Sequence, residues 1–208
     1  MKIQTRTVGP LGVNCYIVED EATKEALLID PGDEADVILA EIEKRQLKVK
    51  YIVNTHGHAD HIGANTEVKK ALQAKLYIHQ ADAAMLGDDR KNLSAFCAQP
   101  VFSPPADAFL EDGMQLCIGE TIWKVLHTPG HTPGGICLYT RGVLFSGDTL
   151  FAESVGRCDF PGGNMSELLE GIKKKLLVLP GDTIVYPGHG PTTQIDWEKK
   201  HNLYIQEV

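Results

Sequence analysis

Short apolar runs rich in β-branched residues recur along the chain, separated by turns that contain Gly, Pro, Asp or Asn. Runs of this length and composition predict β-strands. We expect strands over residues 2–8, 14–19, 25–30, 49–53, 75–79, 114–117, 121–126, 143–146 and 183–186. The sequence Glu111-Asp112-Gly113 is a hairpin signal, and residues 114–117 and 121–126 are the strands expected for that hairpin.

Helical spacing of apolar residues appears between several of these strands. Residues 34–44 and 62–72 can each place their apolar side chains on one stripe of a helix. Further helices are expected over residues 165–177 and 195–201. The segment 87–108 has little periodicity and contains three prolines. We expect it to be a long ordered loop that lies over a functional site, because loops of this length are usually functional or disordered.

Composition narrows the class of protein. The chain has 208 residues, of which 43% are hydrophobic and 23% are charged. These values are typical of a globular protein, and the length predicts one compact domain over residues 1–208. The first residues lack the basic and then apolar segments of a signal peptide, and the apolar runs are too short for a membrane span. We therefore expect a cytoplasmic protein that does not act at a membrane.

The formal net charge of −8 and the five cysteines argue against two further classes. Nucleic acid is a poor match for an acidic chain, because phosphates are bound by clustered Lys and Arg. The basic run 173–175 falls on a predicted helix and indicates a solvated face. The cysteines are scattered and form no C-x-x-C pair, which argues against a disulfide framework or a thiolate metal site. We expect Cys15, Cys117 and Cys137, which lie in strand-like stretches, to be buried.

The strongest chemical signal is the segment 54–61, Asn-Thr-His-Gly-His-Ala-Asp-His, between the predicted strand 49–53 and a predicted helix. A strand-to-helix turn at the edge of a sheet is where α/β proteins place their chemistry. Imidazole and carboxylate side chains together suit zinc and iron. The candidate metal ligands in this segment are His56, His58, Asp60 and His61.

Three more candidate ligands follow predicted strands in the same way. His131 comes after strand 121–126, Asp148 ends strand 143–146, and His189 follows strand 183–186, each beside Gly or Pro. Such residues permit tight turns and leave loops that hold side chains stiffly. A single histidine of this kind is as often an ordinary loop residue as a ligand. Four strand-end turns that all carry ligand-type side chains indicate a metal site.

In order and spacing, these residues resemble the metallo-β-lactamase superfamily over nearly the whole chain. The resemblance rests on the H-x-H-x-D-H cluster, the later lone histidine, the aspartate and the final histidine. It implies the αββα sandwich of that superfamily, with two sheets face to face and helices outside. It also implies two divalent metal ions, zinc first and iron or manganese as alternatives. The implied ligands are His56, His58 and His131 for the first ion, Asp60, His61 and His189 for the second, and Asp148 as the bridge.

The residues after Asp148 resemble one branch of the superfamily, the glyoxalase II-like hydrolases. Gly147-Asp148-Thr149-Leu150-Phe151 is followed by a Gly156-Arg157 turn and by Pro161-Gly162-Gly163. This resemblance implies that a hydroxide bridging the metals cleaves a small anionic thioester, a hydroxyacyl-thiol, and that Asp60 orients the hydroxide besides binding metal.

The same resemblance implies that Arg157 contacts the anionic thiol carrier. The alternative for Arg157 is an exposed loop charge with one surface ion pair. Full glyoxalase II proteins continue into a C-terminal helical region that helps to hold glutathione. No such region follows Trp197 in this chain, so the acyl group and the thiol carrier stay open.

A second enzyme class shares the Gly156-Arg157 turn. The sequence also resembles persulfide dioxygenases, which use one iron held by the equivalents of His56, His131 and Asp148, a 2-His-1-carboxylate set. The ligand set does not exclude this alternative, but the Pro161-Gly162-Gly163 continuation favours the hydrolases. Dizinc β-lactamases fit less well, since they usually place a Cys ligand in the second half of the chain. A non-catalytic binding module is expected to lose a ligand, and all seven are present.

Overall fold

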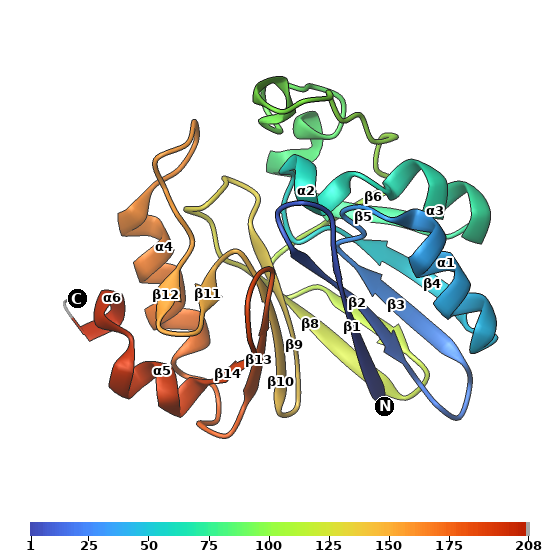
Figure 1. Ribbon diagram of the computed structural model, residues 1–208. Coiled ribbons are helices and arrows are strands. Elements are labelled where there is room, and N and C mark those ends of the chain that lie inside the picture. The colour runs from blue at the N-terminus through green and yellow to red at the C-terminus, as the bar shows by residue number, and fades with distance from the viewer. Residues whose placement is uncertain (207–208) are drawn as a thin grey trace.

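The computed structural model describes residues 1–206 and consists of two β-sheets packed face to face with helices on both outer faces (Figure 1). The first sheet has the strand order β1-β2-β3-β4-β5-β6. Its strands are β1 (Lys2–Val8), β2 (Val13–Glu19), β3 (Glu25–Ile29), β4 (Lys48–Val53), β5 (Lys75–His79) and β6 (Ala108–Leu110). Strands β1 to β3 pair antiparallel, whereas β3 to β6 run parallel.

The second sheet has the strand order β14-β13-β10-β9-β8-β7. Its strands are β7 (Gln115–Ile118), β8 (Thr121–His127), β9 (Ile136–Thr140), β10 (Val143–Gly147), β13 (Ile184–Pro187) and β14 (Thr193–Gln194). Strands β10 and β13 are parallel, and the other neighbours are antiparallel. A separate two-stranded ribbon is formed by β11 (Leu150–Phe151) and β12 (Ser154–Val155).

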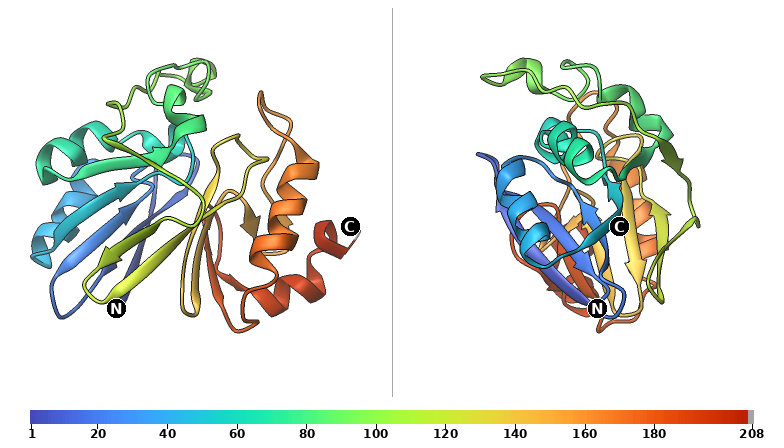
Figure 2. Two further views of the ribbon diagram at one scale, coloured as in Figure 1. Left: turned by 180° about the vertical axis from the view of Figure 1, so that it is seen from behind. Right: turned by 90° about the vertical axis from the view of Figure 1, so that its right-hand side faces the viewer.

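The helices complete the four-layer αββα sandwich that the sequence led us to expect (Figures 1 and 2). The first sheet is covered by α1 (Ala35–Lys44) and α3 (Asn65–Leu72), and the short α2 (Ala59–Ile62) lies at the end of the sandwich. The second sheet is covered by α4 (Met165–Gly171), the π-helical turn Ile172–Leu176, α5 (Ile195–His201) and α6 (Leu203–Gln206). After β5 comes a 3₁₀ segment, η1 (Gln80–Met85).

Three apolar clusters hold these layers together. Between the sheets, Tyr16, Trp123 and Phe145 are buried, with ring centroids 4.8 Å (Tyr16–Phe145) and 5.3 Å (Trp123–Phe145) apart. The other two clusters lie between each sheet and its helices. Because both faces of the central strands are covered, β2 and β10 are buried along their whole length. This explains the unbroken apolar runs in the sequence.

Two local predictions need correction. Residues 114–117 and 121–126 do form a hairpin, but its turn is Gly119-Glu120, with Ile118 opposite Thr121. The Glu111-Asp112-Gly113 turn instead carries the chain from β6 in the first sheet to β7 in the second. The predicted helix 62–72 is divided into α2 and α3, which places the first helix inside the ligand segment.

The predicted loop 87–108 has little regular structure: it contains a short 3₁₀ turn, Ser94–Phe96, and its last residue begins β6. Asn92 in this loop is buried, and its Nδ2 donates to the carbonyls of Met85 (3.0 Å) and Val101 (2.9 Å). The Asn92 carbonyl accepts from the backbone N–H of Ala59 at 3.0 Å. The loop is therefore attached directly to the start of α2.

The five cysteines are unpaired, as expected, but their burial differs from the prediction at one position. Cys15 and Cys137 are buried, whereas Cys117 is exposed because β7 alternates and turns this side chain outward. Among residues 1–206, no helix combines the length and the apolar character that crossing a bilayer requires.

Candidate metal centre

The four strand-end turns that carry the predicted ligands meet at one end of the sandwich, beside α2 (Figure 1). The turn after β4 is joined to the second sheet by a bond from the Ile136 N–H to the Thr55 carbonyl, 2.9 Å long. The turn after β13 is joined to the end of β10 by a bond from the Gly188 N–H to the Gly147 carbonyl, 2.8 Å long. Backbone hydrogen bonds therefore hold ligand segments from both sheets in register.

The first ligand group is His56, His58 and His131. All three side chains are buried, and their ligand nitrogens lie within 4.8 Å of one another. Nδ1 of His58 and Nε2 of His131 are 2.9 Å apart. The group therefore presents three imidazole nitrogens to one point, the arrangement that a tetrahedral metal site requires.

The second ligand group is Asp60, His61 and His189, whose ligand atoms also lie within 4.8 Å of one another. Nε2 of His189 is 3.2 Å from Oδ2 of Asp60 and 3.3 Å from Nε2 of His61. His61 is fully buried, whereas the side chains of Asp60 and His189 are 21% and 28% exposed. This group faces the outside of the sandwich.

Asp148 lies between the two groups. Its Oδ1 is 3.5 Å from Nε2 of His61, and its Oδ2 is 3.5 Å from Nε2 of His131 and 3.6 Å from Nε2 of His189. The close fit requires glycine at position 188, since a Cβ there would lie 2.1 Å from Oδ1 of Asp148. Within residues 1–206, Asp148 is thus the one carboxylate found in contact range of both histidine groups.

Two buried atoms in this cluster support a metal. Nε2 of His56 and Oδ1 of Asp148 are inaccessible to solvent and have no hydrogen-bond partner within residues 1–206. Buried polar atoms are normally hydrogen-bonded, and each exception calls for an explanation such as an ion. Imidazole nitrogen and carboxylate oxygen are also the right donors for a divalent transition metal. The residues present therefore fit the two metal ions that the sequence implied.

Four of the five histidines are oriented by a hydrogen bond at the ring nitrogen that faces away from the cluster. Nδ1 of His61 lies 3.0 Å from Oδ2 of Asp30, and Nδ1 of His131 lies 2.7 Å from the Arg157 carbonyl. Nδ1 of His189 and of His56 lie 3.2 Å from the Leu11 carbonyl and from Oγ1 of Thr55. Such outer partners fix the ring and leave the other nitrogen free for a metal.

The pKa values of His56 and His58 in the first group and of His61 in the second are shifted in opposite directions. Burial, followed by the neighbouring His131 and His61, lowers the pKa of His58 to about 3, and burial likewise lowers the pKa of His56. Burial alone would also lower the pKa of His61, but the carboxylates of Asp60, Asp148 and Asp30 raise it well above its ordinary value. His56 and His58 are therefore kept neutral, as metal ligands must be, and His61 of the second group lies in a field that attracts cations.

Two buried carboxylates support the cluster without belonging to it, and neither was identified from the sequence. Asp30, at the end of β3, accepts from the N–H and Oγ1 of Thr55 at 2.7 Å each, besides contacting His61. Asp82, in η1, accepts hydrogen bonds from two different ligand loops. The only signal for Asp30 was its place before Pro31-Gly32 at a strand end, and the helical segment around Asp82 gave none.

Arg157 lies at the rim of the site, and its backbone and side chain act differently. The carbonyl accepts from Nδ1 of His131, as described above. The guanidinium makes two hydrogen bonds to Asp159, 2.8 Å from Nε and 2.7 Å from Nη2, and its carbon lies 4.0 Å from the ring centroid of Phe160. The Arg157 and Asp159 side chains are 60% and 66% exposed. The surface ion pair expected as the alternative is thus present, on a residue whose main chain contacts the cluster.

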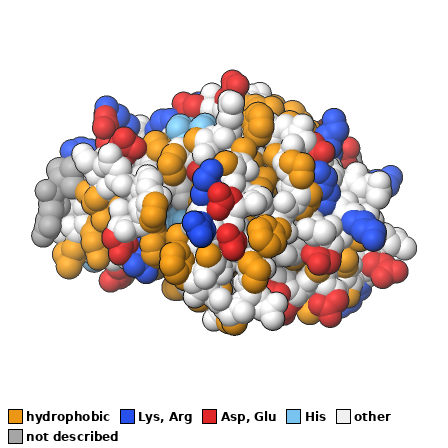
Figure 3. All heavy atoms as spheres, turned by 90° about the horizontal axis from the view of Figure 1, so that it is seen from above, with side chains coloured by type: hydrophobic (Ala, Val, Ile, Leu, Met, Phe, Trp, Pro, Cys, Tyr) orange, Lys and Arg blue, Asp and Glu red, His pale blue; other side chains and the backbone are white. Residues whose placement is uncertain are grey.

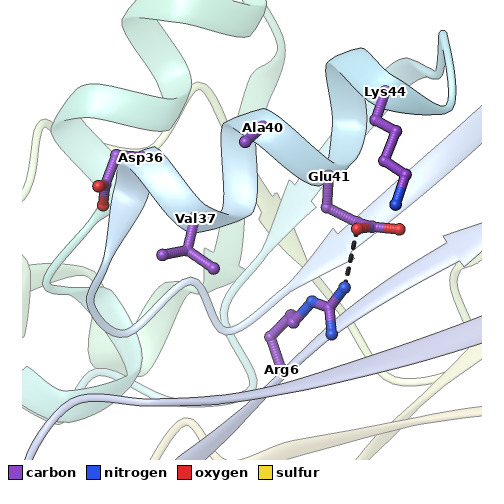
Figure 4. Close-up of a pocket in the computed structure, with 6 residues that line it drawn as sticks. All are labelled: Arg6, Asp36, Val37, Ala40, Glu41 and Lys44. Carbon is purple, nitrogen blue, oxygen red and sulfur yellow. Dashed lines mark hydrogen bonds and ion pairs between the residues drawn. The ribbon is translucent and has the colours of Figure 1, made fainter.

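The surface seen from above shows histidine side chains reaching the exterior among hydrophobic and mixed charged residues (Figure 3). A separate depression lies between β1 and α1, where Arg6 donates to Glu41 at 2.8 Å (Figure 4). Its lining, Arg6, Asp36, Val37, Ala40, Glu41 and Lys44, includes no candidate ligand. This depression is therefore separate from the candidate metal centre.

Comparison with known proteins agrees with this site. The family described as the metallo-beta-lactamase superfamily matches residues 8–189, a span that runs from the end of β1 to the last ligand, His189. This protein therefore belongs to the metallo-β-lactamase superfamily. Members of this superfamily are mostly hydrolases.

Two relatives align over nearly their full length. The probable metallo-hydrolase YqgX of Bacillus subtilis is 37% identical over 99% of this chain and 98% of its own. The hydroxyacylglutathione hydrolase GloC of Haemophilus influenzae is 35% identical over 99% of this chain and 98% of its own.

Three solved structures share the fold and are more than 30% identical to this chain in sequence. BLEG-1, described as a B3 metallo-β-lactamase, has a TM-score of 0.94 and 38% identity over 98% of this chain and 99% of its own. TTHA1623, in a di-iron-bound form, has a TM-score of 0.87 and 38% identity over 97% and 99%. ETHE1 from Myxococcus xanthus has a TM-score of 0.83 and 31% identity over 98% and 84%.

Proposed function

We propose that this protein is a metal-dependent hydrolase that cleaves a small anionic thioester, of the hydroxyacyl-thiol kind cleaved by glyoxalase II-like enzymes. The observation that carries the proposal is the ligand set: six side chains form two groups of three, and a seventh, Asp148, lies in contact range of both. A complete set of this kind is expected of an enzyme, because a binding module has no need to keep both groups.

In this proposal His56, His58 and His131 would hold one divalent ion, and Asp60, His61 and His189 would hold a second. Asp148 would be a ligand shared by both. Zinc is the first expectation, and iron and manganese suit the same donors. When bound, such ions polarise a carbonyl oxygen and make water nucleophilic near neutral pH. The chain's own residues have to place the thioester carbonyl and the attacking water at this pair.

Asp60 is the residue we assign to the water. It lies at the exposed side of the cluster, and its neighbours His61 and His189 outweigh burial and lower its pKa, so it stays an acceptor. Asp60 would serve as a metal ligand and would also accept a hydrogen bond from the attacking water. The departing thiolate needs no strong acid, since thiols ionise near pH 8.5.

Arg157 is the residue we assign to the substrate's negative charge. A planar guanidinium at the rim suits a carboxylate on the thiol carrier. GloC, a relative at 35% identity, is a hydroxyacylglutathione hydrolase, which supports a thioester of this class without defining the carrier.

A second function is favoured by a specific observation. ETHE1 from M. xanthus shares the fold at 31% identity and lends weight to a mononuclear iron persulfide dioxygenase. His56, His131 and Asp148 supply the 2-His-1-carboxylate set that such an enzyme needs. The di-iron form of TTHA1623 shows that iron is bound by a relative of this fold.

The test combines metal analysis with two assays. Protein purified without added metal is analysed for zinc, iron and manganese, and then assayed on S-lactoylglutathione in aerated and in anaerobic buffer. The same preparation is placed in an oxygen electrode with glutathione persulfide, and a chromogenic β-lactam serves as a third substrate because BLEG-1 is described as a lactamase.

We expect about two metals per chain, thioester cleavage at the same rate with and without oxygen, and no oxygen uptake. His201→Ala, which alters a histidine whose ring centroid lies 4.1 Å from that of Trp197, is the matched control and should keep the wild-type rate. Oxygen uptake on persulfide with a single iron and no thioester cleavage overturns the hydrolase in favour of the dioxygenase. Cleavage of the β-lactam alone overturns the thioester as substrate.

A further inference from the structure

Asp82 is a buried carboxylate in η1, a segment that contributes no metal ligand. Its side chain is inaccessible to solvent, and both oxygens are used. Oδ2 accepts from the Gly57 N–H at 3.0 Å and from Oγ1 of Thr132 at 2.7 Å, and Oδ1 accepts from the Gly134 N–H at 2.6 Å. Burial raises the pKa of Asp82, and these three bonds oppose that rise. A buried carboxylate with three donors is strongly held in place.

The three donors lie on two loops that carry the first ligand group. Gly57 is the residue between His56 and His58, and Thr132 follows His131 directly. The H-x-H turn comes from the first sheet and the His131 loop from the second. One carboxylate therefore fastens the loop that supplies two ligands to the loop that supplies the third.

The contact between Asp82 and the backbone of the His131 loop is tightly packed. A Cβ at position 134 would lie 2.6 Å from Cγ of Asp82, so the backbone of this loop approaches the carboxylate as closely as glycine allows. The same two segments meet again beside it, where the rings of His79 and His127 stack at 4.0 Å with an angle of 9° between them. The position of η1 against the His131 loop is thus set at two points.

The second ligand group depends on other supports. His61 is held by Asp30, and His189 by the Leu11 carbonyl. No hydrogen bond from Asp82 reaches Asp60, His61 or His189 among the bonds found within residues 1–206. Asp82 therefore supports the first group alone, whereas Asp30 contacts His61 of the second group and, through Thr55, also reaches His56 of the first.

We infer that Asp82 is the positioning residue of the first metal group: it sets the spacing between the His56–His58 turn and His131, and so controls the affinity of that group for metal. This inference rests on the proposed metal centre, but not on the substrate or the reaction.

The sharpest variant is Asp82→Asn, which preserves shape. If the amide nitrogen replaces Oδ1, the Gly134 N–H loses its acceptor, and if it replaces Oδ2, the Gly57 N–H does. The hydroxyl of Thr132 can rotate to accept, but a backbone N–H cannot. Either orientation therefore releases one of the two loops, with almost no change in volume.

The experiment measures zinc affinity by competition with a chelator in two backgrounds. His189→Ala leaves the first group as the stronger site, and His58→Ala leaves the second. We expect Asp82→Asn to lower zinc affinity about 10- to 100-fold in the His189→Ala background, the range known for outer-sphere partners of metal ligands. In the His58→Ala background it should leave zinc affinity unchanged.

A second pair of variants keeps the test valid if Asp82→Asn does not fold. Thr132→Val removes one of the three donors and should weaken the first group about three- to tenfold, by the loss of one hydrogen bond, whereas Thr132→Ser keeps the hydroxyl and should restore affinity. The matched control is Asp107→Asn, which alters a carboxylate that accepts from the Leu76 N–H at 2.7 Å and pairs with Lys69 at 2.9 Å, neither of which is a candidate ligand.

Four results would count against the inference. An equal loss of affinity in both backgrounds, or a lower melting temperature with unchanged affinity, means that Asp82 supports the fold alone. Failure of Thr132→Ser to restore what Thr132→Val loses has the same meaning. Wild-type protein that binds no zinc, iron or manganese overturns the metal centre itself, and this inference with it.

Discussion

The two ligand groups of this protein are built from the same kinds of side chain but differ in burial and support. His56, His58 and His131 are closed off from solvent, whereas Asp60 and His189 in the second group are partly exposed. The first group is braced by a side-chain carboxylate shared between two loops, and His189 is braced by one backbone carbonyl. We infer that the second group is the side from which water and substrate arrive, and the one that loses metal more readily.

Asp148 does not fit this comparison of the two groups, because it contacts histidines of both. Burial alone would raise the pKa of Asp148, but His61, His131 and His189 keep it below its ordinary value. The carboxylate is therefore charged at the point where two cations would meet, and it offsets their repulsion. Its removal should erase the difference between the groups.

The largest effect is expected for Asp148→Ala. Loss of the shared negative ligand should weaken both groups, so metal content should fall well below two per chain and kcat/KM by about 10³-fold or more, since each metal supplies several kcal/mol of charge stabilisation. Metal analysis and the thioester assay measure the two effects. Asp196→Ala, at an exposed carboxylate paired with Lys199, is the control. Full activity with two bound metals would show that the ligand assignment is wrong.

A smaller and one-sided effect is expected for His189→Ala. The second group loses a ligand, whereas the first keeps all three of its histidines and Asp148. About one metal per chain should remain, and activity should fall less than in Asp148→Ala, because one polarising ion is still in place. Elemental analysis of the two variants, purified side by side, makes the comparison. Equal loss of metal in both would mean that the two groups do not act as separate sites.

The part of the site that could be predicted from the sequence is the part that leaves a local pattern of residues. Residues 56–61 were recognisable because four ligands lie in one short turn after a strand, a purely local pattern. His131, Asp148 and His189 were weak candidates singly and became strong only as a set. The αββα sandwich was expected from the family pattern of these ligands, and the two sheets and their helices confirm it.

What the sequence did not reveal depends on contacts between distant segments. Asp82 meets Thr132 across fifty positions, and Asp30 meets His61 across 31, so neither has a local pattern. Cys117 was expected inside because its stretch is apolar, but β7 lies at the edge of the second sheet and alternates in burial. The Glu111-Asp112-Gly113 turn was misplaced because a tight turn indicates a reversal without saying which sheet the chain enters next.

The smallest effect is expected at Arg157, and it tests whether the surface loop beside His131 recognises charge. The guanidinium already binds Asp159, and that bond holds the pKa of Asp159 at about 2, so a substrate carboxylate has to compete with it. Arg157→Ala should raise KM for an anionic thioester about two- to fivefold, the range of a solvent-exposed ion pair. The bond to His131 comes from the backbone carbonyl and remains, so kcat and metal content should not change.

Asp159→Asn tests the opposite change, because it removes the negative charge that the Arg157 guanidinium now binds. KM for the anionic thioester should fall, while KM for a neutral thioester should change little in either variant. Steady-state kinetics on the matched pair of substrates separates the two quantities. If Arg157→Ala alters the neutral and the anionic substrate equally, the residue supports the turn and does not recognise charge. A fall in kcat with loss of metal from the first group would show that the side chain, and not only the carbonyl, holds His131 in place.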